Sequence, residues 1–167
     1  MGSNDTMENS MRDGARMGPH DPTLAEWISC APFEQLLHMQ IVTAHNGEAV
    51  LTMPFLYEYA QGAGLMHGGA LVSLADTALV MAIKSILPID THFATIELTA
   101  KYHRGVTQGK ITAEAKLTDH EGHRINGKAG ILDESGQLVM EFDAVFQLSR
   151  KTDMSNVAFD RIGPSST

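Results

Sequence analysis

The sequence predicts an α+β fold in which an antiparallel sheet covers one long apolar helix. Residues 70–87 are mostly apolar without strand-like alternation, whereas several later runs alternate apolar and polar side chains. His45-Asn46-Gly47 adds a hairpin signal, because Asn-Gly suits a type I′ turn. A helix that is apolar all round needs more cover than one sheet gives. We therefore expect a partner subunit, in a homodimer or a homotetramer.

The 167 residues and their 43% hydrophobic content suit one globular domain. Residues 1–20 are polar and rich in Gly, Asn, Asp and Met, which predicts a disordered N-terminal tail. The domain is expected over residues 21–150, and residues 151–167 are expected to form a loose C-terminal tail. Pro22 lies near a favoured first helical position, so a helix is expected to begin there, with Leu24, Trp27 and Ile28 on one face.

The hairpin joins strands expected near residues 39–44 and 48–53. The long helix follows over about residues 69–87, and Pro88 ends it. Further strands are expected near residues 95–102, 111–117, 123–132 and 138–146. In the first of these, simple alternation places Ile96, Leu98, Ala100 and Tyr102 on one face and Thr95, Glu97, Thr99 and Lys101 on the other.

The charge balance restricts the partners. A net charge of −8 argues against nucleic-acid binding, which needs clustered Lys and Arg, but leaves room for a small anionic ligand. The apolar run 70–87 contains Asp76 near its middle, so no membrane span is expected. Cys30 is the single cysteine, which excludes an intrachain disulfide and indicates a cytoplasmic protein. No motif surrounds Cys30, and a structural role is favoured over a nucleophilic one.

Asp76 is the first candidate for chemistry. An unpaired buried carboxylate costs several kcal/mol or takes a raised pKa, so its place on an apolar helix requires a reason. Asp76 is either a general base or nucleophile, or a structural side chain bonded to a nearby group. Gly68 and Gly69 open the same helix, where free backbone N–H groups can stabilise an oxyanion; a plain glycine turn is the alternative.

The segment from Gly64 to Ala78, with its Gly-Leu-Met-His-Gly-Gly start, resembles the hotdog-fold acyl-CoA thioesterases of the PaaI-like family. The resemblance extends over about residues 36–148. It implies a hotdog fold, hydrolysis of a thioester to free acid and CoA without metal or cofactor, and a site shared between subunits. Two positions differ from the family pattern or match it loosely: Gly105 stands where the family has Pro, and Gln61 is the best match to an Asn or Gln before the His-Gly-Gly.

Within this resemblance, Asp76 is the catalytic carboxylate and the N–H of Gly68 polarises the carbonyl. His67 orients the loop and the thioester or acts as a base, Gln61 positions the loop or water, and Thr95 holds the carboxylate or water. Each of these three has a plain structural alternative. Gly69, Arg104, His123 and Arg124 are the candidate contacts to substrate.

Other functions remain open. A non-catalytic acyl-CoA-binding hotdog protein is the second hypothesis, and a hotdog hydratase or dehydratase is the third. His120-Glu121-Gly122-His123 could suggest a metal site, but its glycine lies in a turn and the pattern is not helical H-E-x-x-H. No metal is expected.

Overall fold

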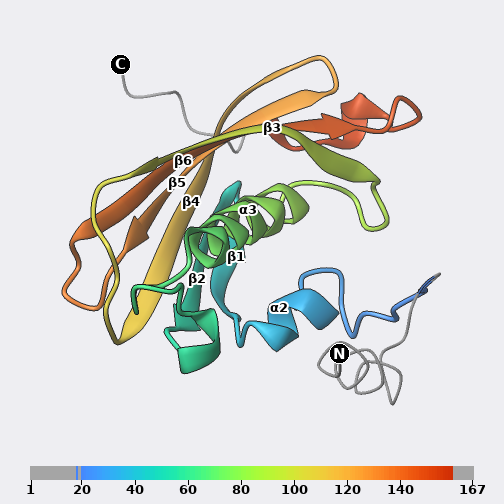
Figure 1. Cartoon of the computed structure of the whole chain (residues 1–167). Helices are drawn as coiled ribbons and strands as arrows, with labels where there is room; N and C mark the ends of the chain where they lie inside the picture. Colours follow the sequence, from blue (N-terminus) through green and yellow to red (C-terminus); the bar gives the residue numbers. More distant parts are fainter. Residues whose placement is uncertain (1–17, 19, 160–167) are drawn as a thin grey trace, which may run out of the picture.

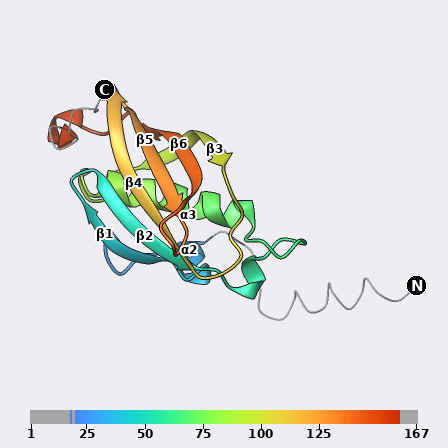
Figure 2. The same cartoon turned by 90° about the vertical axis from the view of Figure 1, so that its left-hand side faces the viewer.

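The computed structural model describes residue 18 and residues 20–159. A curved antiparallel sheet in the order β1-β2-β4-β5-β6-β3 wraps around the long helix α3 (Figures 1 and 2). This confirms the predicted α+β hotdog fold. The elements are α2 (Pro32–Leu36), β1 (Gln40–His45), β2 (Glu48–Pro54), η1 (Tyr57–Tyr59), α3 (Gly68–Lys84), β3 (Phe93–Tyr102), β4 (Lys110–Glu121), β5 (Arg124–Leu132), β6 (Leu138–Leu148) and η2 (Met154–Asn156).

The β1–β2 hairpin forms where Asn-Gly predicts it. Asn46 and Gly47 have φ values of 52° and 79°, the left-handed values that a type I′ turn requires at both central positions. Ala44 pairs with Ala49 across the turn, which fixes the register of β2 against β1. Leu51 and Met53 of β2 then lie fully buried in the core.

Helix α3 packs against β2, β4 and β5 through fully buried side chains such as Leu74, Leu79 and Ile83. Burying each of these contributes roughly 1.5–3 kcal/mol. One face is less covered than the sequence predicts: Gly69 is exposed, and Ser73, Asp76 and Val80 at helical spacing are only partly buried. In this single chain the helix is therefore not buried all round.

The helix expected from Pro22 does not form, because local bonds hold the chain differently. The Ser29 hydroxyl donates to the carbonyl of Glu26 at 2.7 Å and accepts from its N–H, which competes with helical bonding. The indole of Trp27 donates to the carbonyl of Lys84 at 3.0 Å, so Trp27 is bonded at the end of α3. The first helix, α2, begins instead at Pro32.

The described part of the C-terminal segment packs against the domain. Val157 is buried, and the N–H of Ala158 donates to the carbonyl of Ile86 just beyond α3. The ring of Phe159 stacks on His120 of β4 with 3.5 Å between centroids. Residues 157–159, within the segment expected to be loose, thus pack on the domain beside Ile86 and His120. Residues 160–167, and the predicted disordered tail apart from residues 18 and 20, lie outside the described residues.

Candidate active site

Asp76 lies in the middle of α3, on its partly covered face. The Thr95 hydroxyl of β3 donates to Asp76 Oδ1 at 2.9 Å. Burial raises the pKa of the Asp76 carboxyl above its ordinary value, and the Thr95 hydrogen bond lowers it in part. The carboxylate is therefore a stronger base than an exposed aspartate would be. This pattern of desolvation with one hydrogen-bond donor is typical of catalytic carboxylates and also occurs at structural ones.

A β-bulge brings Thr95 to Asp76. The register of β3 against β6 shifts between Thr95 and Glu97, so Thr95 pairs with Phe146 while Leu98 pairs with Ala144. Since Phe146 and Ala144 both lie in the core, Thr95 and Leu98 share the inner face of the sheet. The simple alternation expected from the sequence, with these two residues on opposite faces, is therefore wrong at this point. Bulges commonly redirect a side chain next to a functional site.

The start of α3 leaves one backbone donor unused. The N–H of Gly69 donates to His67 Nδ1 at 2.9 Å, and those of Ala70 and Leu71 donate to the carbonyl of His67. Within the described part of the chain, no group accepts from the N–H of Gly68. The first N–H of the helix, at the positive end of its dipole, is thus free to bind an anionic oxygen.

The hydrogen bond from Gly69 determines which nitrogen of His67 carries its proton. A backbone N–H can only donate, so Nδ1 accepts and the proton of the neutral ring lies on Nε2. His67 is the N-cap of α3, and its own N–H donates to the carbonyl of Tyr59 at 2.7 Å. In this geometry His67 presents a donor to its surroundings, which supports an orienting role over a general base.

Gln61 is held by its own loop. Its side-chain oxygen accepts from the N–H of Ala63, its carbonyl accepts from Gly64, and its N–H donates to Leu65. The oxygen is therefore occupied locally, and the side-chain amide nitrogen is the group that can still donate. The loop continues to Met66, whose N–H donates to the carbonyl of Val106, so Gln61 is carried by a loop fixed at both ends.

Tyr102 belongs to the candidate site, although its sequence pattern predicted only a strand residue. Its hydroxyl donates to the carbonyl of Gly68 at 3.0 Å and so joins the end of β3 to the start of α3. A Cβ atom at Gly68 would lie only 2.9 Å from this hydroxyl, so a side chain there would displace Tyr102. Tyr102 pairs with the buried Met140 and therefore lies on the inner face, like Thr95. In the sequence, Tyr102 stands at the end of the alternating strand, next to the polar residues Lys101 and His103.

The three candidate CoA contacts at loops lie in two places that are far apart in one chain. Arg104 follows the end of β3, near the start of α3, whereas His123 and Arg124 lie at the turn between β4 and β5. The pairings of Arg124 with Gln147 and of Tyr102 with Met140 place them at opposite ends of the sheet. The nine residues of β5 span about 30 Å between these ends. The chain alone does not bring Arg104 together with the other two.

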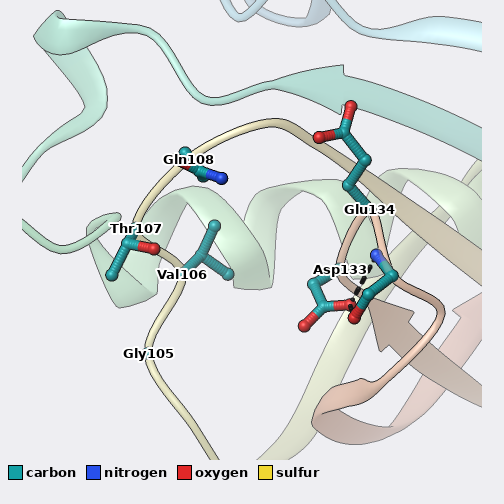
Figure 3. Close-up of a pocket in the computed structure, with 7 residues that line it drawn as sticks. Gly105, Val106, Thr107, Gln108, Asp133 and Glu134 are labelled. Carbon is teal, nitrogen blue, oxygen red and sulfur yellow. Dashed lines mark hydrogen bonds between the residues drawn. The ribbon is translucent and has the colours of Figure 1, made fainter.

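Gly105, the departure from the family pattern, packs under Leu65. A Cβ atom at Gly105 would lie 2.9 Å from the Leu65 side chain, so a proline there would require this side chain to shift. Beside it, the 105–108 segment and the 133–135 turn line a hollow of about 320 Å³ (Figure 3). Asp133 and Glu134 make this hollow acidic, which disfavours CoA phosphates. It is separate from Asp76.

The histidines of the possible metal motif have other partners. The His120 ring stacks on Phe159, and His123 Nε2 lies 3.3 Å from the carbonyl of Thr152. Across the described residues, His, Cys, Asp and Glu side chains form no group of three suited to a metal. A separate search of the same residues finds no helix long and apolar enough to cross a membrane.

Comparison with known proteins identifies the relatives. Residues 63–140 match the family model described as the thioesterase superfamily. A Halobacterium salinarum protein, whose name proposes an esterase, is 31% identical over 104 residues, which cover 59% of this chain and 65% of that protein. The chain thus spans less than two thirds of this relative's length.

Solved structures share the fold. The Escherichia coli PaaI protein from the phenylacetic acid degradation operon superposes with a TM-score of 0.65 at 24% identity, covering 72% of this chain and 86% of that one. A Staphylococcus aureus thioesterase superposes with a TM-score of 0.66 at 20% identity, covering 70% and 98%. Two variant structures of the Staphylococcus protein replace with alanine a glutamine and a glutamate fifteen positions later.

Proposed function

We propose that this chain, whose residues 63–140 match the thioesterase superfamily, hydrolyses an acyl-CoA thioester to a free acid and CoA. The observation that carries this proposal is the pair of complementary groups on α3. Asp76 is a half-buried carboxylate with a raised pKa, and Gly68 offers a free N–H at the helix start. Gln61 precedes Asp76 by fifteen residues, the separation of the two substituted residues in the Staphylococcus thioesterase.

The chemistry needs one base and one oxyanion donor. Asp76 takes a proton from water, and the water oxygen attacks the thioester carbonyl while the carbonyl oxygen becomes an oxyanion bound by the Gly68 N–H. Collapse of this intermediate breaks the carbon–sulfur bond, and the CoA thiolate leaves with the proton from Asp76. Direct attack by Asp76 would instead give an anhydride that water then hydrolyses.

A second copy of the chain is needed to complete this site. Asp76 and Gly68 are eight residues apart on one helix, or about 12 Å at 1.5 Å per residue, too far for one carbonyl to meet both groups. We propose a dimer in which Asp76 of one chain faces Gly68 of the other. Two such dimers could form a tetramer, and the arrangement could bring Arg104 of one chain toward His123 and Arg124 of the other.

A partly exposed surface on α3 and β3 supports the dimer. Ser73, Asp76 and Val80 of α3 and Leu98 and Tyr102 of β3 form what we call the open face. Leu98 is 45% exposed although its cross-strand partner Ala144 is buried. β3 is also an edge strand of ten residues, and its free edge can pair with another strand.

The substitution Asp76→Asn tests the proposed activity. Thiol release from aryl-, short- and long-chain acyl-CoA substrates is measured in EDTA, which we expect to leave wild-type turnover unchanged. Positioned general bases contribute typically 10²–10⁴-fold, so kcat of Asp76→Asn should fall by at least about a hundredfold. The variant should still bind a non-hydrolysable acyl-CoA analogue, because Gly68 remains.

Glu114→Gln is the matched control, since Glu114 is an exposed carboxylate on the outer face of β4. It should retain wild-type kcat. Wild-type turnover by Asp76→Asn would show that Asp76 is structural. If the wild-type chain binds the analogue but hydrolyses no thioester, the protein is a non-catalytic acyl-CoA-binding module.

A further inference from the structure

We propose that Tyr102 is a positioning residue for hydrolysis, which sets the direction of the Gly68 N–H through a hydrogen bond to the backbone. The inference rests on the proposed function, because it concerns the same oxyanion donor. Tyr102 has no role in the chemistry itself. Its hydroxyl would act through the start of α3, where a small rotation of one peptide changes the direction of the free N–H.

The contact is specific in its geometry. The Tyr102 hydroxyl donates to the Gly68 carbonyl at 3.0 Å across 34 residues of sequence. The ring also lies against Gly68 itself, because a Cβ there would meet the Tyr102 hydroxyl and ring carbons at 2.9–3.2 Å. The hydrogen bond to the carbonyl and the contact with the ring together restrict the backbone of Gly68, the residue that carries the oxyanion donor.

The hydrogen bond continues through the next peptide. The carbonyl of Gly68 belongs to the same peptide unit as the N–H of Gly69, and that N–H donates to His67 Nδ1 at 2.9 Å. Linked hydrogen bonds polarise one another. Tyr102 and His67 therefore hold the peptide that follows Gly68, and the peptide that precedes it is held through the His67 carbonyl, which accepts from Ala70 and Leu71.

The first turn of α3 holds the Gly68 N–H only through the other end of its peptide. That end is bound because the His67 carbonyl accepts from Ala70 and Leu71, whereas the N–H itself has no acceptor among the described residues. The helix begins with two glycines, which have the widest backbone freedom of all residues. Tyr102 of β3 adds a contact from outside the helix, which restricts this freedom at Gly68.

The test is Tyr102→Phe, which keeps the ring and removes only the hydroxyl. Losing one neutral hydrogen bond should lower kcat about three- to tenfold. KM should stay within about twofold, because a donor that acts on the transition state affects kcat more than binding. Tyr57→Phe is the matched control: Tyr57 is 90% exposed and should behave as wild type.

A second readout separates positioning from folding. The amide of Gly69 in ¹H–¹⁵N spectra should shift and exchange faster in Tyr102→Phe, while the melting temperature and the affinity for a non-hydrolysable acyl-CoA analogue stay at wild-type values. A substitution that lowers kcat and moves the Gly69 amide, with these two quantities unchanged, supports the inference.

The remaining outcomes overturn it. Unchanged kcat in an active enzyme refutes the positioning role alone and leaves the proposed function in place. A rise in KM with constant kcat would show that Tyr102 binds substrate directly, and a fall in activity that follows a fall in melting temperature would show a structural role. Absence of thioester hydrolysis by the wild-type protein refutes the proposed function, and this inference with it.

Discussion

At the scale of single residues, the burial of Asp76 favours its proposed role as a base but opposes the stability of the fold. Placing a carboxylate on the inner side of the sheet raises its pKa, which makes it a better base but costs stability when it ionises. The Thr95 hydroxyl offsets part of this cost by donating to Oδ1. The balance between the two effects decides the pH range in which Asp76 is a carboxylate.

Thr95→Val should shift the acidic limb of the pH–rate profile to higher pH. Hydrolysis requires ionised Asp76, so kcat/KM rises with pH through its pKa. Burial has already raised that pKa, and removal of the Thr95 hydrogen bond removes the opposing effect, so the pKa rises further. The measurement is kcat/KM against pH for both proteins.

Thr99→Val serves as the control, because Thr99 lies on the outer face of the same strand and is exposed. The acidic limb of the pH–rate profile of Thr99→Val should coincide with that of the wild type. A limb that stays in place in Thr95→Val, or moves toward lower pH, would contradict this account of Asp76.

At the scale of secondary-structure elements, local signals in the sequence were sufficient where the conformation is local. Asn46-Gly47 predicted the hairpin, and the apolar run predicted α3 to within one residue at its start and three at its end. The bulge at Thr95 depends on how β3 pairs with β6, which alternation within one strand does not contain. The helix expected after Pro22 failed for a similar reason, since Trp27 bonds to a residue 57 positions away.

Gly127→Ala should test how closely α3 packs on the sheet. Gly127 lies in β5 beneath the helix, and a Cβ there would approach Leu79 to 2.5 Å, with Leu117 at 3.3 Å. Both leucines are fully buried, so neither has free space to move into. Overpacking of this kind typically costs about 1–3 kcal/mol, which denaturant unfolding would measure.

Gly130→Ala is the comparison within the same strand. The Cβ there would meet Leu138 at 3.5 Å, an ordinary contact, and the unfolding free energy should change little. Equal effects of the two substitutions would show that the loss comes from strand backbone and not from the approach of α3 at Gly127.

At the scale of the whole molecule, the sequence names candidate residues for the site but does not contain their arrangement. Asp76, His67 and Gly68 come from one contiguous motif, and in the structure His67 is the N-cap of α3 and Gly68 is its first residue. The role of Tyr102 depends on the end of β3 reaching the start of α3. Contacts between distant segments, and between chains, are not contained in any local spacing.

Leu98→Lys should weaken the proposed dimer. It places a charge on the open face, where a second chain would bury it, and a buried unpaired charge costs several kcal/mol. Light scattering at micromolar concentration should report a mass near 36 kDa for the wild type, about twice the 18.1 kDa chain, and a lower mass for the variant.

Val42→Lys is the matched control for this experiment. Val42 is similarly exposed, at 58%, but lies on β1 at the other edge of the sheet. Its mass should equal that of the wild type. Loss of the dimer in Val42→Lys but not in Leu98→Lys would place the interface at β1 and contradict the proposed interface at β3.

Mixed dimers should reveal whether the site is shared. Asp76→Asn removes the base, and Gly68→Pro removes the oxyanion donor. Proline is favoured at the first helical position, and His67 already has the extended ψ of 130° that it requires. Its Cβ would displace the Tyr102 side chain, which a Cβ at this position approaches to 2.9 Å, so the damage is confined to this end of α3. Each variant alone should be inactive. Co-refolding equal amounts produces half mixed dimers, each with one site that contains both intact groups, so activity should recover to about a quarter of the wild-type value. Sites contained within single chains would show no recovery, because every chain in the mixture then lacks one of the two groups.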